Sequence, residues 1–222
     1  MLVMHPGTDD GARAAAVLAG RAATPVRYRP VPDVAAILAA VDRGTAAMGV
    51  VPLEDSHDGL CAATVDGLAF DTADVVVTDE VDLREGETTT RWVTVATVPP
   101  SAIEDPQTLL FVIPQLNRPG TLLEMVAAFS SRGLNLTRIG TRPLHGTIGM
   151  YGFLLEVEGS PRDVWLADAL ADVLEASSHL KFLGTFPAGQ RAWSEVSGRV
   201  PAGPDLRTLD DLDALAARVA DS

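Results

Sequence analysis

One short stretch of the sequence has the residue types of an anion-binding helix start. Asn117, Arg118, Pro119 and Gly120 form a polar turn directly before an apolar segment with helical spacing. The first turn of a helix leaves backbone N–H groups without partners, and these donors, together with the helix dipole, suit a carboxylate. Small residues at Gly120 and Thr121 would also let a ligand approach the backbone closely. The turn is therefore a candidate carboxylate site, although Pro and Gly here could simply begin a helix.

The stretch around this turn, 109–187, predicts alternating strands and helices that would hold it in place. The apolar pattern gives strand, helix, strand, strand, helix, strand, which is the double βαβ order of a ferredoxin-like α+β sandwich. Gly133 is expected to end the first helix in a left-handed cap. The expected strands are 109–114, 134–139, 151–157 and 180–186, and the helices begin near 120 and 166.

The preceding stretch, 1–98, predicts an α/β sheet with helices on both faces. The apolar run 48–53 is typical of a buried parallel strand. The other expected strands are 2–4, 26–29, 75–77 and 92–98, and the expected helices are 10–20, 32–44 and 62–69. A proline-bearing connector at 99–106 is the expected boundary between one domain at 1–98 and another at 106–188. Residues 189–222 are expected to form a linker and a short C-terminal helix.

Composition excludes several classes of function. The chain has 222 residues, enough for two small domains, and a net charge of -13, which argues against binding to nucleic acid. An anionic ligand would therefore need a locally positive pocket. Cys61 is the single cysteine, and no apolar run is long enough to cross a membrane. We expect a cytoplasmic protein with no membrane segment, and the four histidines do not have metal-ligand spacing.

The second stretch resembles the ACT domain, a small amino-acid-binding regulatory module, in the version fused to prephenate dehydratase. The similarity rests on 117–120, on Gly133 to Ile139 and on Thr141-Arg142-Pro143, where the family has Glu-Ser-Arg-Pro and this chain has Gly140 in place of the glutamate. The resemblance implies a homodimer or higher homo-oligomer that binds L-phenylalanine between paired ACT domains. It implies these effector-binding residues: Gly120, Thr121, Leu122, Leu123, Asn135, Leu136, Thr137, Thr141, Arg142 and Pro143.

The first stretch resembles a prephenate dehydratase lobe of the periplasmic-binding-protein-like α/β type. Residues 49–56, Gly-Val-Val-Pro-Leu-Glu-Asp-Ser, are similar to the family run Gly-Val-Val-Pro-Ile-Glu-Asn-Ser, and Thr90-Arg91-Trp92 stands where the family has Thr-Arg-Phe. The implied reaction converts prephenate to phenylpyruvate, with loss of carbon dioxide and the ring hydroxyl, and needs no metal or organic cofactor. The resemblance implies Thr90 as the donor to the departing hydroxyl, Arg91 as the carboxylate clamp, and substrate contacts from Thr8, Glu54 and Ser56.

One departure from the family leaves two functions open. The family's catalytic part has two lobes with the active site between them, whereas the stretch 71–89 is too short to build a second lobe. A half-open cleft would leave the substrate in water and weaken each electrostatic contact. The chain is therefore expected to be either a compact prephenate dehydratase of L-phenylalanine biosynthesis, regulated through its ACT domain, or a non-catalytic regulatory protein that binds an aromatic amino acid.

Overall fold

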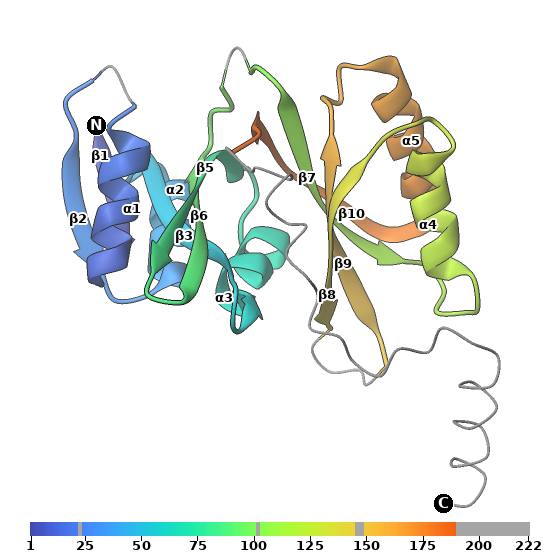
Figure 1. Ribbon diagram of the computed structural model, residues 1–222, viewed down its shortest axis with the longest axis horizontal. Helices are drawn as coiled ribbons and strands as arrows, with labels where there is room; N and C mark the ends of the chain where they lie inside the picture. The colour runs from blue at the N-terminus through green and yellow to red at the C-terminus, as the bar shows by residue number, and fades with distance from the viewer. Residues whose placement is uncertain (22–23, 101–102, 145–148, 190–222) are drawn as a thin grey trace, which may run out of the picture. The chain divides into compact units, whose positions relative to one another are not determined.

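The protein is a mixed α/β molecule with two β-sheets (Figure 1). A computed structural model describes residues 1–21, 24–100, 103–144 and 149–189. Residues Met1–Gln190 form one compact unit. The linker and short helix expected within 189–222 lie outside the described residues, except for Gly189.

The first sheet has three parallel strands extended by an antiparallel pair. Its order is β2-β1-β3-β6-β5, and β1, β2 and β3 run parallel. The short strand β4 pairs with β3. The bounds are β1 Leu2–Pro6, β2 Arg27–Val31, β3 Met48–Asp55, β4 Gly59–Leu60, β5 Val76–Glu85 and β6 Thr88–Ala96.

Helices cover both faces of this sheet, as the sequence predicts. Helix α1 (Asp9–Ala19) begins at Thr8, whose side chain accepts a hydrogen bond from the Gly11 N–H, and it packs on Val50. Helix α2 (Val34–Asp42) is capped by Asp33 in the same way and packs in the cluster that contains Val51. Because neighbouring residues of a strand point to opposite faces, the two helices lie on opposite sides of the sheet.

The stretch in which the family's second lobe would have to lie is a β-hairpin. Helix α3 (Ala62–Asp66) continues into a π-helical turn, η1 (Gly67–Asp71), and β5 and β6 follow. These strands are longer than the predicted 75–77 and 92–98, and Gly86 joins them at φ +60°. The apolar signal in this hairpin is weak, since Val81 and Leu83 alternate with charged residues and pack only at the margin of the core.

The second sheet has the strand and helix order predicted for its stretch. It comprises β7 (Pro106–Pro114), α4 (Thr121–Ser130), β8 (Leu136–Pro143), β9 (Tyr151–Glu158), α5 (Val164–Glu175) and β10 (Ser177–Pro187). The strands are antiparallel in the order β10-β7-β9-β8, which makes β8 an edge strand. Both helices cover one face of the sheet (Figure 1), where Met125, Phe129 and Leu166 pack on Leu110 and Leu155.

The opposite face of the second sheet packs directly on the first part of the chain. One core cluster joins Phe111 and Leu183 of the second sheet with Val77 and Val93 of the first. Strand β10 approaches so closely that a Cβ atom at Gly184, where φ is +136°, would lie 2.2 Å from the Val77 carbonyl oxygen. The two predicted domains therefore share a core, and the predicted boundary falls within one compact unit.

Candidate functional site

A cavity of about 260 Å³ opens beside the start of α4. Its volume is close to the lower end of the range for small-ligand pockets. Four of the predicted effector-binding residues line it, Gly120 to Leu123, and two aromatic residues of β9 lie opposite. The full lining is Pro114, Asn117, Arg118, Gly120, Thr121, Leu122, Leu123, Met150, Tyr151 and Phe153. The cavity therefore offers a polar turn on one side and apolar or aromatic side chains on the other.

The polar turn of this cavity is held by its own hydrogen bonds. Asn117 Nδ2 donates to the Gly149 carbonyl at 2.8 Å, and the Arg118 N–H donates to Thr121 Oγ1 at 3.2 Å. Gly120 precedes α4 at φ +93°, and no side chain caps the helix. Arg118 pairs at 2.9 Å with Glu124 in an exposed contact, and such surface pairs contribute only about 0–1 kcal/mol. The guanidinium at the rim could therefore turn to an anionic ligand at little cost.

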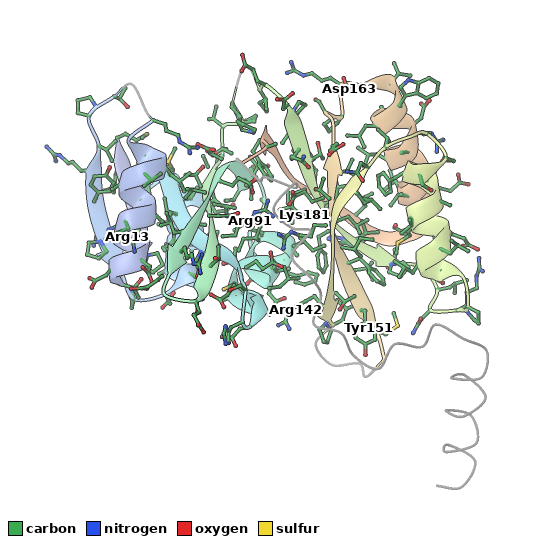
Figure 2. The ribbon with its side chains drawn as sticks, in the orientation of Figure 1. Arg13, Arg91, Arg142, Tyr151, Asp163 and Lys181 are labelled. Atoms are coloured by element: carbon green, nitrogen blue, oxygen red, sulfur yellow. The ribbon has the colours of Figure 1, made fainter. Side chains whose placement is uncertain are left out.

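The predicted residues of β8 divide into two groups around this cavity. Thr141 pairs with Phe153 and Pro143 pairs with Tyr151, so both lie on the strand beside the lining. Arg142 points to the other face of the sheet (Figure 2), where its guanidinium makes two hydrogen bonds to Asp66, at 2.8 and 2.6 Å. Its partner is therefore a carboxylate of the first part of the chain.

The other three predicted effector residues lie at the far end of β9. Leu136 pairs with Val157, six residues along from Tyr151, which is about 20 Å at the rise of an antiparallel strand. Asn135 donates to Glu158 and Thr137 donates to Glu156, both at 3.0 Å. The structure thus does not bring Asn135, Leu136 and Thr137 to the cavity, and an effector role for them stays a prediction.

The predicted substrate residues Thr8, Ser56 and Thr90 lie at one end of the first sheet. Thr8 follows β1, Ser56 follows β3, and Thr90 stands near the start of β6, which runs antiparallel to β3. Thr90 Oγ1 donates to Asp55 Oδ2 at 2.8 Å, and the Thr89 N–H donates to Ser56 Oγ at 2.9 Å. The topology therefore gathers these hydroxyls at the carboxyl end of the parallel strands, where open α/β sheets bind ligands.

This end of the sheet carries negative charge. The His57 N–H and the Thr90 hydroxyl donate to Asp55 and lower the pKa of its carboxyl, so Asp55 is ionised where the family run has asparagine. A hydrogen bond and charge repulsion from Asp10, at the start of α1, raise the pKa of the Glu85 carboxyl on the neighbouring hairpin. A dicarboxylate substrate would need cations that offset these groups.

Arg91, the predicted carboxylate clamp, lies in a buried ion-pair cluster between the two sheets (Figure 2). Its guanidinium donates to Glu80 of β5 and to both carboxylate oxygens of Glu156 of β9, at 2.8 and 3.3 Å. The residue is 3% exposed. Burial raises the pKa of both glutamates, and the positive charge of Arg91 opposes this shift.

Glu80 and Glu156 lie outside the motifs that predict the site residues. A usable signal was present for Glu156, because it is the one charged residue in the apolar run Phe153 to Val157. A charge inside a buried strand needs a partner. The signal for Glu80 was weaker, since the surrounding hairpin has many charged residues.

Glu54, the remaining predicted substrate residue, also contacts the second sheet. It forms an ion pair with Arg138 of β8, and Arg138 Nε lies 3.6 Å from Glu156 Oε2. Burial lowers the pKa of the Arg138 guanidinium. Glu54, Arg138, Glu156 and Arg91 thus form one chain of charges that crosses from the first sheet to the second.

The chain is similar in sequence to prephenate dehydratases over part of their length. The prephenate dehydratase of Amycolatopsis methanolica is 31% identical over 146 residues, which cover 64% of this chain and 46% of that protein. The match thus spans less than half of this relative. No model of a known protein family matches the chain.

Solved structures of prephenate dehydratases share the fold. The enzyme from Streptococcus mutans aligns with a TM-score of 0.71 at 25% identity, covering 86% of this chain and all of that one. The Arthrobacter aurescens enzyme in complex with L-Phe aligns with a TM-score of 0.70 at 19% identity, over 100% of this chain and 98% of that one. GqqA, described as a novel type of quorum quenching acylase, aligns with a TM-score of 0.70 at 25% identity, over 84% of this chain and 95% of that one.

These likenesses define first a class, a mixed α/β protein with two packed sheets. Within that class, sequence and fold together relate the chain to the prephenate dehydratase family. Within the described ranges, no helix has the length and apolarity needed to span a bilayer. The same ranges contain no group of three or more His, Cys, Asp or Glu that could hold a metal ion.

Proposed function

We propose that the cavity at the start of α4 binds an aromatic amino acid, with L-phenylalanine as the first candidate. The observation that carries the proposal is the lining, in which the helix start at Gly120 faces Tyr151 and Phe153. The ligand carboxylate would lie against the N-terminal backbone of α4 and the Arg118 guanidinium, and its ring against Leu122, Leu123 and the aromatic pair. The complex of the Arthrobacter aurescens enzyme with L-Phe supports this choice of ligand.

In this proposal the second sheet with α4 and α5 is an ACT domain that pairs with a second copy. The βαββαβ order and the edge position of β8 support this assignment. We expect a homodimer or higher homo-oligomer, in which a partner could add contacts at the open side of the cavity.

The proposal continues with prephenate dehydratase-like chemistry at the carboxyl end of β1 and β3. Thr90 would donate to the departing ring hydroxyl, while Ser56 and Thr8 would hold the substrate. Loss of carbon dioxide and hydroxide aromatises the ring, so orientation and one proton donor are the main requirements, and no cofactor is needed. The similarity to enzymes named prephenate dehydratase supports this part, which would put the protein in L-phenylalanine biosynthesis.

A second candidate function is binding of the amino acid without catalysis. It is favoured by Arg91, which lies buried between Glu80 and Glu156 instead of facing a substrate. It is also favoured by the ionised Asp55, which accepts the Thr90 hydroxyl. A regulatory protein would keep the cavity and dispense with the cations at the substrate end.

Two measurements on the full chain separate these functions. L-phenylalanine should raise the melting temperature, because a ligand that binds only the folded state stabilises it by about 2.7 kcal/mol at a hundred times its Kd. Prephenate turnover to phenylpyruvate, lost in Thr90→Ala, would establish the enzyme. Stabilisation without turnover at high protein concentration would establish the binding protein.

A paired substitution localises the ligand. Leu123→Asp puts a negative charge on an exposed residue of the cavity lining and should abolish stabilisation by L-phenylalanine. Val164→Asp, on the exposed surface of α5, is the matched control and should leave it unchanged. Equal stabilisation of both variants would show that the ligand does not bind at α4.

A further inference from the structure

Strand β8 presents alternate residues to the first part of the chain. Arg138 pairs with Glu54 at the end of β3, and Arg142 makes two hydrogen bonds to Asp66 at the end of α3. Between them, Gly140 packs against Leu60 of β4, and a Cβ atom at Gly140 would lie 2.6 Å from Leu60 Cδ1. Three residues at a spacing of two therefore contact three consecutive elements.

These contacts flank the turn that carries Ser56, one of the predicted substrate residues. The turn 55–59 comprises the last residue of β3, the connecting residues 56–58 and the first residue of β4, and it includes Asp55 and Ser56. Asp55 accepts hydrogen bonds from the His57 and Asp58 N–H groups and from Thr90, so the turn is internally ordered. Its attachment to the second sheet, in contrast, runs through the residues that flank it on both sides.

The ion pairs that make this attachment are partly shielded from water. The Arg142 and Asp66 side chains are 21% and 20% exposed, and those of Arg138 and Glu54 are 14% and 32% exposed. Two parallel N–H···O bonds fix the Arg142 guanidinium in the plane of the carboxylate, so the pair restrains orientation as well as distance. A shift of β8 would therefore be passed to Glu54 and Asp66.

The other face of β8 leads to the α4 cavity. Thr141 and Pro143 pair with Phe153 and Tyr151, the two residues of β9 that line it. Because successive residues of a strand point to opposite faces, one strand contacts the cavity wall on one side and the 54–66 segment on the other.

We propose that Arg138 and Arg142 are positioning residues, which hold the turn 55–59 against β8 and couple its conformation to occupation of the α4 cavity. The coupling rests on the proposed binding of L-phenylalanine at that cavity, whereas the positioning does not. Ligand contacts with Tyr151 and Phe153 would set the position of β8, and the two arginines would set that of the turn. This would link the effector and substrate sites within a single chain.

Hydrogen exchange of the full chain, measured by mass spectrometry on peptides covering 54–66, tests the positioning. Arg142→Met keeps the length of the side chain but removes its charge. It should speed exchange of the 55–59 amides about tenfold, the effect of losing about 1.4 kcal/mol of local stability. Arg132→Met is the control, since Arg132 pairs with Asp172 of α5 on the helical side of the second sheet. It should leave 55–59 unchanged.

A charge-reversed double variant distinguishes the loss of this ion pair from general unfolding. In Arg142→Asp/Asp66→Arg the pair is restored in reverse, and exchange at 55–59 should return toward that of the wild type. Unchanged exchange in Arg142→Met, or an equal effect of Arg132→Met, would overturn the positioning role.

Addition of L-phenylalanine tests the coupling. Exchange at 55–59 should slow in the wild type, whereas Arg142→Met should keep its ligand-induced rise in melting temperature but lose this response. A response that persists in Arg142→Met would overturn the coupling. If L-phenylalanine does not stabilise the wild type, the proposed amino-acid binding is wrong, and the coupling that rests on it is wrong as well. The positioning role is then still tested by hydrogen exchange without ligand.

Discussion

At the scale of single residues, the buried charges between the sheets are the most consequential feature. Arg91 is shared by Glu80 and Glu156, and all three are almost fully buried. A buried cluster of this kind adds little stability compared with an apolar core, yet removal of one member leaves an uncompensated charge. Its members should therefore be sensitive to substitution, whatever the protein binds.

Arg91→Met tests whether this arginine has a structural role. Without its positive charge the two glutamates lose their central partner, and the free energy of unfolding should fall by about 3–5 kcal/mol. Urea denaturation measures the change, with Arg84→Met on the exposed hairpin as the control. A loss of prephenate binding with stability within about 1 kcal/mol of the wild type would instead favour the clamp role that the resemblance implies.

The raised pKa values of Glu80 and Glu156 predict a pH dependence of stability. Between the ordinary pKa of glutamate, about 4.3, and the raised value, the folded protein binds more protons than the unfolded chain. The contribution of each group to the free energy of unfolding is thus fully present below this window and is lost as pH rises through it. In urea titrations from pH 4 upward, Glu156→Gln should make the decrease of the free energy of unfolding with pH shallower. Glu175→Gln, at an exposed residue, should not change this decrease. Parallel curves for Glu156→Gln and the wild type would contradict the prediction.

These residues also mark the limit of what the sequence predicts about the site. The resemblance to the family motifs predicted that Thr8, Ser56 and Thr90 serve one substrate site, and the topology brings them to one end of the first sheet. The sequence could not indicate that Arg91 turns inward, because its partner Glu156 lies 65 positions along the chain. Pairing between such distant residues follows from the packing of one sheet on another, which local patterns do not encode.

At the scale of elements, periodicity predicted the helices and, apart from the short strand β4, the strands of both sheets, but it missed the length of the β5–β6 hairpin. Apolar spacing identifies α2 and α4 because one side of each helix packs on a sheet. In β5 the polar residues of the alternation include buried Glu80, so the pattern resembles a charged loop. The hairpin is ordered by the pairing of β6 with β3 and by the contact of β5 with β10, which are long-range effects.

Gly140 gives a test at this scale. The family's Glu-Ser-Arg-Pro turn would place a glutamate here, but β8 packs so closely on Leu60 that even a Cβ atom must displace it. Gly140→Glu should therefore lower the free energy of unfolding by about 1–3 kcal/mol, the usual cost of overpacking. In a double-mutant cycle measured by urea denaturation, Gly140→Glu/Leu60→Ala should lose less free energy of unfolding than the sum of the losses of the two single substitutions. Additive effects would show that the two positions do not contact each other.

At the scale of the whole molecule, the second sheet completes the core of the first part of the chain. Val77 and Val93 of the first sheet lie in the same buried cluster as Phe111 and Leu183 of the second. The second sheet is thus the packing partner of the first. The same fold carries different chemistry, since structures named as dehydratases and as an acylase align almost equally well with this chain.

The shared core predicts a single cooperative unfolding transition for the two sheets. If each stretch had its own independent core, urea would unfold them at different midpoints, whereas one core makes them a single unit. In a Trp193→Phe background, Trp92 reports on the first sheet, where it is 5% exposed, and Trp165 reports on α5. In this background Trp165→Phe leaves Trp92 as the reporter, and Trp92→Phe leaves Trp165. In each of these two proteins the urea midpoint by fluorescence should coincide with the midpoint by circular dichroism.

Phe111→Ala opens the shared core and should lower both midpoints together, with a loss of about 3–5 kcal/mol in the free energy of unfolding. Two separated transitions, or a shift of only one reporter, would show that the predicted domains unfold independently.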